Sequence, residues 1–467
     1  MATMSAPESG VAVRMYRLGY TGDCFLLAFR AADGAARYML VDCGVYQATS
    51  GSADHMRAVV QDIAEATGGT LHVLAVTHEH WDHTSGFHYA KKLFDKLTIH
   101  DVWLAWTEDP HNDMARRLRD RRHAMALMIR EAAARLQAAG DPMGAGLEGL
   151  LGFNGPGLGI RSTREQMAYV ASLVERPKFC KPGQPPLSIP NVEGVSVWVL
   201  GPPQDEALLS RSDPRGSEAY EDTEMALNPD NAFFGAALSR GPTGMQLPFD
   251  EPLGIPMGDL HQRAEHAAFF EERYGSGEGA KNHPSAWRRI DADWLLRSGQ
   301  LALDLDGDTN NTSLVLAIEL VPGGRVLLFP GDAQVGNWLS WQSVAWSGAA
   351  TGGEPVHGSD LLKRTVLYKV GHHGSHNATL RAKGLELMES QDLMAMIPVE
   401  EEHARSMDWE MPFEPLLRRL TEKTKGRIIR ADRGVGQRPA HVRERDWERF
   451  LRRVTESELW VELVVGG

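Results

Sequence analysis

A short apolar run that ends in a group of metal-binding side chains constrains this sequence more than any other feature. Residues 71–76 have the composition of a buried strand, and the run stops at Thr77. Three histidines and an aspartate follow within six residues: His78, His80, Asp82 and His83. Imidazole and carboxylate groups are preferred ligands of Zn²⁺ and similar divalent ions. A surface loop with chance histidines is the alternative, but only 18 of 467 residues are histidines, so the segment predicts a metal site.

Two later β-prone runs also end in candidate ligands. Residues 326–329 lead into a Pro-Gly-Asp turn that ends at Asp332, and residues 365–370 lead into a Gly-His-His-Gly segment containing His372 and His373. A Gly-Asp pair after a strand is usually an ordinary turn. Glycines beside histidines, however, let the backbone approach a ligand. Together with the first segment, these runs predict Asp332 and either His372 or His373 as further ligands.

Strands and helices alternate at both ends of the chain, which is typical of an α/β fold. The β-prone runs are residues 24–29, 38–41, 71–76, 195–200, 314–320, 326–329, 365–370 and 395–399. Helical patterns cover residues 58–66 and 413–424, and residues 88–173 are expected to be mainly helical. Residues 204–299 are poorly periodic and are typical of an insertion.

The motifs taken together resemble the metallo-β-lactamase-fold hydrolases, and more closely the hydrolase domain of ComEC-type competence proteins. The matching segments are residues 20–24, 40–44, 78–83, 310–314, 330–333 and 371–375. The resemblance covers roughly residues 11–90, 178–203 and 300–435. It implies an α/β fold of the αββα metallo-β-lactamase sandwich type, with two large, partly helical insertions.

The resemblance also implies a domain organisation. We expect a disordered N-terminus over residues 1–10 and a single domain over residues 11–467. Insertions are expected at about 90–177 and about 204–299, and a helical extension at about 436–467. The insertions would form a lid, a specificity surface or a site for a protein partner.

By the same resemblance, the ligands would hold two divalent metal ions, either zinc or manganese. His78 and His80 would hold one ion, while Asp82, His83 and one of His372 and His373 would hold the other. Asp332 would bridge both ions, and Asp82 and Asp332 would thus serve the catalytic centre directly. Asp42 would orient a ligand imidazole, or else it is only a turn residue. Five further residues would donate hydrogen bonds to substrate oxygens, unless they merely form turns: Asn310, Asn311, Thr312, Ser375 and Asn377.

Two departures from the family pattern bear on the site. These enzymes generally have a further histidine before the bridging aspartate, but residues 304–313 contain none. Asp308, Asn310 or water would take its place. The ComEC-like C-terminal segment carries a His-Pro, where this chain has Met411 and Pro412, so His403 is a candidate replacement.

The function expected first is a metal-dependent phosphodiesterase or nuclease that uses a metal-bridging hydroxide. Two arginine groups, residues 116–130 and 443–453, would contact a nucleic-acid backbone, although solvated helix faces also explain them. The net charge of −13 favours instead the hydrolysis of a small ester, lactone, thioester or nucleotide. The missing histidine leaves open a binding or regulatory module with weakened catalysis.

The cellular location is expected to be the cytoplasm, without a membrane partner. Cys24, Cys43 and Cys180 show no pairing pattern, and the sequence has neither a signal-peptide pattern nor an apolar run of membrane-spanning length.

Overall fold

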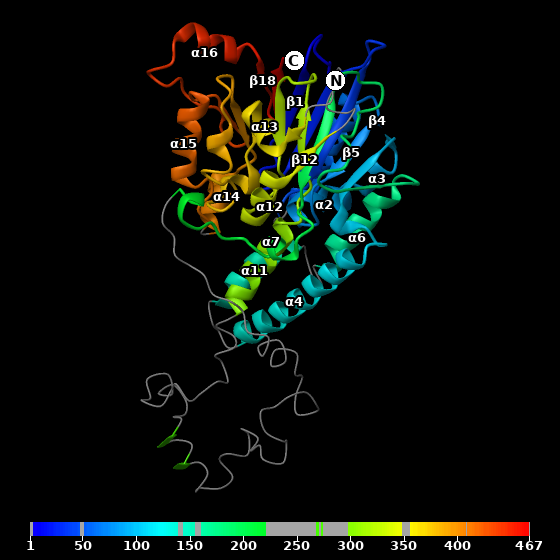
Figure 1. Cartoon of the computed structure of the whole chain (residues 1–467). Coiled ribbons are helices and arrows are strands. Elements are labelled where there is room, and N and C mark those ends of the chain that lie inside the picture. Colours follow the sequence, from blue (N-terminus) through cyan, green and yellow to red (C-terminus); the bar gives the residue numbers. More distant parts are fainter. Residues whose placement is uncertain are drawn as a thin grey trace. The chain divides into compact units, whose positions relative to one another are not determined.

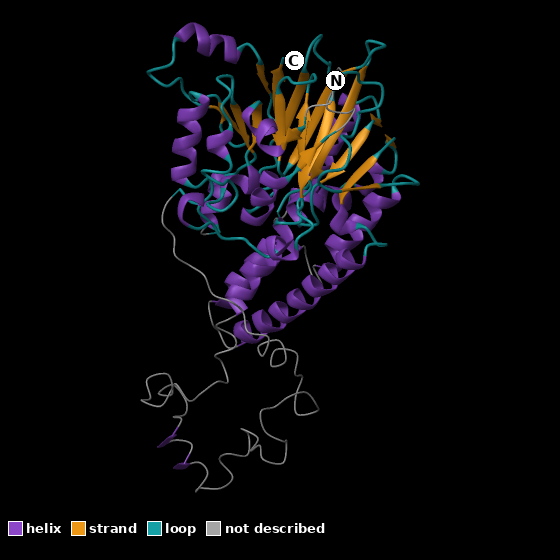
Figure 2. Ribbon diagram, in the orientation of Figure 1, coloured by secondary structure: helices purple, strands orange, loops and turns teal. Residues whose placement is uncertain are grey.

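The computed structural model is a mixed α/β protein (Figures 1 and 2). It describes residues 3–46, 51–138, 143–154, 160–220, 268–269, 272–273, 298–347, 355–407 and 409–466. The chain divides into two compact units. The first comprises residues 1–123, 152–226 and 304–467, and the second comprises residues 124–151 and 227–303. All the candidate ligands belong to the first unit.

The larger sheet of the first unit has eight strands in the order β18-β19-β1-β2-β3-β5-β7-β8. Its strands are β1 (Val11–Tyr16), β2 (Cys24–Arg30), β3 (Ala36–Cys43), β5 (Val73–Val76), β7 (Val102–Ala105), β8 (Lys178–Cys180), β18 (Val454–Glu456) and β19 (Trp460–Val465). β1, β2 and β3 are antiparallel neighbours. The strands from β3 to β8 are parallel, so β3, β5 and β7 all end at the same edge.

The smaller sheet has seven strands in the order β17-β16-β15-β14-β11-β10-β9. Its strands are β9 (Ser196–Gly201), β10 (Val315–Glu319), β11 (Val326–Phe329), β14 (Thr365–Lys369), β15 (Met394–Ile397), β16 (Ile428–Arg430) and β17 (Gly434–Val435). β11, β14, β15 and β16 are parallel. All of the β-prone runs expected from the sequence therefore contain strands.

One apolar core joins the inner faces of the two sheets. Phe25 of β2 and Phe329 of β11 meet edge to face, with ring centroids 5.6 Å apart, and both are 1% exposed. The outer face of each sheet carries its own apolar cluster, to which helices contribute. Those on the larger sheet are α1 (Ser52–Ala66), α2 (Trp81–Tyr89) and α6 (Ile160–Ser172), and those on the smaller are α12 (Val335–Ser340), α13 (Gly358–Lys363) and α15 (Glu414–Thr424).

The candidate ligands lie where parallel strands of both sheets end. Thr77 follows β5, and its carbonyl accepts a hydrogen bond of 2.8 Å from the amide of Leu314, directly before β10. This bond ties the ligand segment of the larger sheet to the smaller one. Ends of parallel strands are a usual place for a site, because the loops that leave them converge.

The sequence-based organisation needs three corrections. Residues 102–105 form β7 inside the segment predicted to be helical and inserted, because four apolar residues are too short a run to reveal their period. Residues 3–10 are not disordered: the Met4 carbonyl accepts a hydrogen bond from the Tyr38 hydroxyl at 2.7 Å, and Met4 is buried. The C-terminal extension is helical only in α16 (Glu444–Leu451), after which β18 and β19 join the larger sheet.

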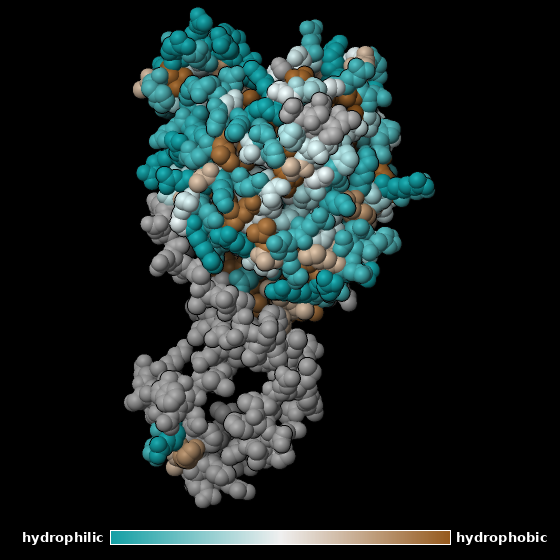
Figure 3. Space-filling model, viewed as in Figure 1, coloured by the Kyte–Doolittle hydropathy of each residue, from teal (hydrophilic) through white to brown (hydrophobic). Residues whose placement is uncertain are grey.

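The second predicted insertion is described only in part. Residues 204–220 contain α7 (Glu206–Leu209), whereas residues 221–267, 270–271 and 274–297 lie outside the described part of the chain. On the face drawn in Figure 3, hydrophilic side chains predominate among the coloured residues. Within the described ranges, no helix combines the length and the apolar character needed to cross a membrane.

The C-terminal strand provides a stability test. Leu463 of β19 is fully buried in the core between the sheets. We expect Leu463→Ala to lower the free energy of unfolding by about 2–5 kcal/mol, the usual cost of such a truncation. Urea denaturation measures this loss. Glu458→Ala, at an exposed position before the strand, should change stability by less than about 0.5 kcal/mol, and equal effects of the two substitutions would contradict the packing of β19.

Candidate metal centre

Three chain segments bring the predicted ligands together. His78 and His80 follow β5, Asp82 and His83 lie in the first turn of α2, Asp332 follows β11, and His372 and His373 lie in a short turn (Gly371–Gly374) after β14. All seven side chains are buried, and His372 is the most exposed at 6%. The structure thus gathers the complete predicted ligand set in one interior region.

Close backbone packing makes this gathering possible. A Cβ atom on Gly44 would lie 2.5 Å from the backbone of His83 and of Thr84, so only glycine lets β3 run so close to α2. His372 and His373 have φ angles of 42° and 53°, in the left-handed region that non-glycine residues rarely adopt. The His372 amide donates a hydrogen bond of 3.0 Å to Asp332 Oδ1, which holds this turn against the end of β11.

Four ligand atoms lie at distances suited to one metal ion. His83 Nε2 is 3.1 Å from Asp332 Oδ2 and 3.7 Å from Asp82 Oδ2, and His373 Nε2 is 3.5 Å and 3.0 Å from the same two oxygens. Tetrahedral ligands with bonds of about 2.1 Å lie about 3.4 Å apart. These atoms would therefore hold a cation, and His373, not His372, points into the cluster.

Asp23, which the sequence analysis left without a role, also belongs to this region. Asp23, His83, Asp332 and His373 form a buried group whose potential ligand atoms lie within 4.8 Å of one another and that could hold a metal ion. The oxygens of Asp23, however, approach the Nδ1 atoms of His83 and His373, at 3.8 and 3.7 Å. Asp82 approaches the Nε2 atoms instead.

The Nδ1 atoms of both histidines already have partners. His83 Nδ1 lies 2.8 Å from Asp42 Oδ2, and His373 Nδ1 lies 2.8 Å from the carbonyl of Pro398. Such contacts orient a ligand imidazole and leave Nε2 to bind the metal. Asp42 has the position expected for this role, and it also accepts hydrogen bonds from the Thr77 amide and hydroxyl. Because Nε2 is the free side, Asp82 suits the fourth ligand position better than Asp23.

Lys369, at the end of β14, is a second residue that the sequence analysis missed. Its ammonium group forms ion pairs with Asp23 Oδ2 and, at 3.2 Å, with Asp332 Oδ1, and Lys369 is 2% exposed. Asp332 Oδ1 is thereby occupied, and only Oδ2 faces the histidines. In the sequence, Lys369 could have been noticed as a charged residue at the end of an otherwise apolar strand.

His78 and His80 form the other half of the site. His78 Nδ1 contacts the hydroxyls of Thr77 and Ser313, at 3.1 and 3.3 Å. The Nε2 atoms of both histidines are buried and lack a hydrogen-bond partner among the described residues. Burying a polar group without a partner costs free energy, so these two unpartnered nitrogens, on rings whose centroids are 4.7 Å apart, are suited to a cation.

Buried charges dominate the electrostatics. Burial disfavours the charged form of His83, but the carboxylates of Asp332 and Asp82 outweigh it and raise the pKa of His83 well above its ordinary value. Burial acts against ionised Asp332 too, yet His83 and Lys369 keep the pKa of Asp332 well below its usual range. For His80, burial outweighs the nearby carboxylates of Asp82 and Asp332 and lowers the pKa of His80 to about 4. The imidazole of His80 is thus neutral and available as a ligand at neutral pH.

The five residues predicted to contact substrate mostly make internal hydrogen bonds. The Asn311 amide donates to the Arg211 carbonyl, and its oxygen accepts from the backbone of Gln334 and Asn337. Thr312 donates to the carbonyl of Thr309. Ser375 contacts His372 Nδ1 and donates to Asn377. Asn310 donates to Asp306, and its oxygen is buried without a partner among the described residues.

Aromatic side chains lie next to His80. The rings of His80 and Phe153 are 5.7 Å apart, and Phe153 stacks on Trp409 at 5.1 Å. His403, the candidate replacement for the family histidine, belongs to this aromatic group: its ring contacts Tyr46 and Trp409, and its Nδ1 lies 3.0 Å from the Thr21 hydroxyl.

Several arginines of the two predicted phosphate-binding groups have internal partners. Arg122 is buried and pairs with Glu79 at 2.8 Å. Arg119 donates to the Thr107 carbonyl, and Arg453 to the Val464 carbonyl. Arg443 pairs with Asp446. These contacts weaken the interpretation of the two groups as nucleic-acid surfaces.

No protein-family model matches the chain, and neither the curated proteins nor the solved structures with which it was compared contain a match. The geometry of the site and the resemblance of its motifs therefore carry the functional interpretation.

Metal binding can be tested without any substrate. We expect Zn²⁺ or Mn²⁺ to raise the melting temperature of chelator-treated protein, because a ligand at 100 times its Kd stabilises the folded state by about 2.7 kcal/mol. His373→Ala should abolish most of this shift. His376→Ala, three residues away at an exposed position, should retain it, and an unchanged shift in His373→Ala would exclude His373 as a ligand.

Proposed function

We propose that the chain is a binuclear metal-dependent hydrolase of the metallo-β-lactamase αββα type and that it cleaves phosphodiester bonds. The observation that carries this proposal is the pair of adjacent ligand groups. Asp82, His83, Asp332 and His373 present ligand atoms at metal-sharing distances. His78 and His80 present two more nitrogens that have no partner within the described chain.

Each residue would contribute to hydrolysis in a definite way. Two bound cations would supply a hydroxide at neutral pH and stabilise the negative charge that develops on the substrate. Asp42 and the Pro398 carbonyl hold His83 and His373 in the orientation that exposes Nε2. Lys369 keeps Asp332 ionised and turned so that Oδ2 faces the ligand cluster. The chain thus supplies preorganised ligands, and no side chain needs to act as the nucleophile.

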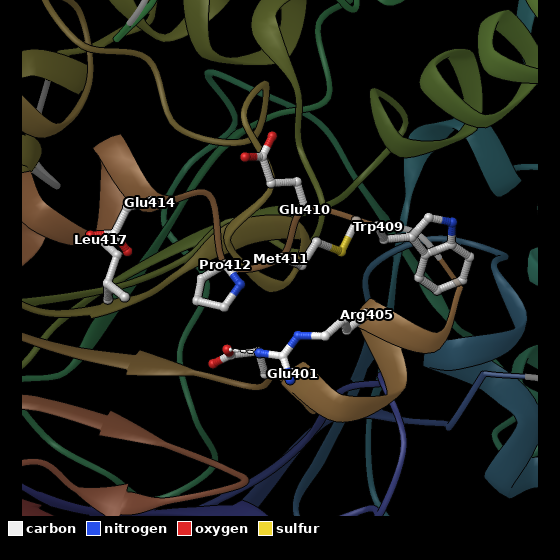
Figure 4. Close-up of a pocket in the computed structure, with 8 residues that line it drawn as sticks. All are labelled: Glu401, Arg405, Trp409, Glu410, Met411, Pro412, Glu414 and Leu417. Atoms are coloured by element: carbon white, nitrogen blue, oxygen red, sulfur yellow. Dashed lines mark hydrogen bonds and ion pairs between the residues drawn. The ribbon is translucent and has the colours of Figure 1, made fainter.

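The aromatic group favours a substrate with a planar base. Trp409 is half-buried, packs against the rings of Phe153, Tyr46 and His403, and lines a surface pocket of about 470 Å³ (Figure 4). Pro412, on the same pocket, borders the metal-binding turn, because a Cβ on Gly374 would lie 3.0 Å from the Pro412 ring. A half-buried aromatic side chain that lines a surface pocket near a phosphodiesterase centre suits the stacking of a nucleobase.

Charge around the same pocket favours a second candidate, the hydrolysis of a small neutral ester or lactone. Glu401, Glu410 and Glu414 line the pocket with a single arginine, Arg405, which pairs with Glu401 (Figure 4). These carboxylates and the net charge of −13 repel a polyanion. A neutral ester or lactone would not be repelled in this way. Among phosphodiester substrates, a nucleotide or a short single strand carries fewer charges than duplex nucleic acid and is therefore the better substrate.

Activity is tested with bis-p-nitrophenyl phosphate, labelled single- and double-stranded DNA, and RNA, each with Zn²⁺ or Mn²⁺. We expect phosphodiester cleavage that falls at least about 100-fold in Asp332→Asn and Asp82→Ala, since even residues that only support ligands contribute 10- to 100-fold. His376→Ala should cleave at the wild-type rate. Turnover of esters or lactones with no phosphodiester cleavage would establish the second candidate.

Salt then separates polymer from small substrates. A protein that neutralises several phosphates loses substrate affinity steeply as salt rises. Because arginines of both groups have internal partners, we expect KM for nucleotide substrates to change less than about threefold between 50 and 200 mM salt. A steep rise in KM would point to a polyanion-binding surface.

Trp409 tests the contribution of stacking. We expect Trp409→Ala to raise KM for a nucleotide or dinucleotide substrate about 5- to 150-fold, which corresponds to about 1–3 kcal/mol per stacked base, with little change in kcat. Trp409→Phe keeps an aromatic face and should recover most of the affinity. An unchanged KM in Trp409→Ala would remove the base from this pocket.

A further inference from the structure

Two ligands are too few for a stable metal position on the His78 side of the site. Catalytic zinc sites generally have three protein ligands and one open position. His78 and His80 supply two, with ring centroids 4.7 Å apart and both Nε2 atoms buried without a hydrogen-bond partner in the described chain. Asp332 would be a ligand of this ion only by sharing its carboxylate with the other ion. A further oxygen or nitrogen on this side would complete the set.

Asp306, on the helix α11 (Ser298–Asn310), brings such an oxygen to His80. Its Oδ1 lies 3.8 Å from His80 Nε2, within the range of about 3.0–4.2 Å open to two ligands with bonds of about 2.1 Å on one ion. This oxygen is buried and, like the two nitrogens, has no hydrogen-bond partner among the described residues. Two unpartnered atoms from different segments, Asp306 Oδ1 and His80 Nε2, thus lie close together, with the ring of His78 next to that of His80.

The other oxygen of Asp306 is already fixed. Asn310, one helical turn later, donates a hydrogen bond of 2.9 Å from Nδ2 to Asp306 Oδ2. Side chains four residues apart lie on the same face of a helix, so Asn310 can hold the carboxylate with Oδ1 turned to His80. This arrangement matches the way in which carboxylate ligands are oriented by their neighbours in metal sites.

The negative charge around Asp306 also favours binding of a cation there. Asp306 lies close enough to Asp82 and Asp332 for both to act on it electrostatically. The buried ammonium of Lys369 pairs with Asp23 and Asp332, not with Asp306. A largely buried carboxylate near other carboxylates is costly unless a cation or a proton compensates its charge.

The neighbouring acidic residue on the same helix faces elsewhere. Asp308 interacts with Arg121 and Arg122 and accepts a hydrogen bond from Ser210. Asp308 therefore interacts with these two arginines. It was one of the residues expected to replace the missing histidine. Asp308 consequently offers a matched control.

We propose that Asp306 is the third protein ligand of a divalent cation held by His78 and His80, in the place where related sites use a histidine. The inference rests on the proposed binuclear site but concerns metal binding alone. Asp306 then belongs to the metal site together with six of the seven residues predicted from the sequence, His372 being the exception, and Asn310 acts as its positioning residue.

Cobalt titration of chelator-treated protein tests this assignment. Equilibrium dialysis with Co²⁺, followed by metal analysis, should give two equivalents for wild type and for Asp308→Asn. Asp306→Ala should bind one equivalent tightly and the second at least about 10-fold more weakly, and Asp306→His should restore the second. The visible absorption of bound Co²⁺ provides an independent readout, because losing a ligand changes the spectrum of that ion.

Two results would overturn the assignment: fewer than two equivalents in wild type, or two equivalents with unchanged affinity and spectrum in Asp306→Ala. A folded Asp306→His variant with two equivalents guards against loss of binding through misfolding. Failure of the proposed hydrolase function would look different, since wild type would then bind two equivalents and cleave no phosphodiester.

Discussion

The buried carboxylate of Asp332 is the interaction on which the rest of the site depends. Its Oδ1 is held by the ammonium of Lys369 and the amide of His372, while its Oδ2 faces the Nε2 atoms of His83 and His373. One carboxylate thus connects the end of β11, the end of β14 and the start of α2. Removing a charged partner from such a buried pair commonly costs 3–5 kcal/mol, so stability and function share the same contacts.

The fold brings the partners of the Asp332 carboxylate together. Two sheets join across one apolar core, and parallel strands from both end where Asp42, His78, Asp332 and His373 lie. Gly44 lets the backbone of β3 touch the beginning of α2, and the turn at His372 and His373 adopts unusual backbone angles. Strain of this kind is found at functional sites, where the surrounding structure enforces it.

The sequence predicted the site best where several candidate ligands follow one apolar run within a short segment. The strands that lead into His78, Asp332 and His372 were predicted because each is an apolar run ended by polar residues. β7 was missed, since four apolar residues cannot distinguish a strand from part of a helix. β19 was missed although its burial alternates along the strand, as a half-buried strand requires.

The site residues that were not predicted from the sequence were missed for a different reason. Asp306 is one of three alternating aspartates, Asp304, Asp306 and Asp308, that the sequence cannot rank. Asp23 and Lys369, like Asp306, gain their importance from partners far along the chain. Lys369 meets Asp23 across 346 positions, which a local pattern cannot reveal. The choice of His373 over His372 likewise depends on a turn whose side-chain directions follow from its left-handed backbone.

The most direct test of the central claim is anomalous diffraction at the zinc edge from crystals of the protein soaked with Zn²⁺. We expect two peaks. One should lie within bonding distance, about 2.0–2.2 Å, of His83 Nε2, His373 Nε2, Asp82 and Asp332, and the other at the same distance from His78 Nε2 and His80 Nε2. A map with no peak at His83 and His373 would contradict the account.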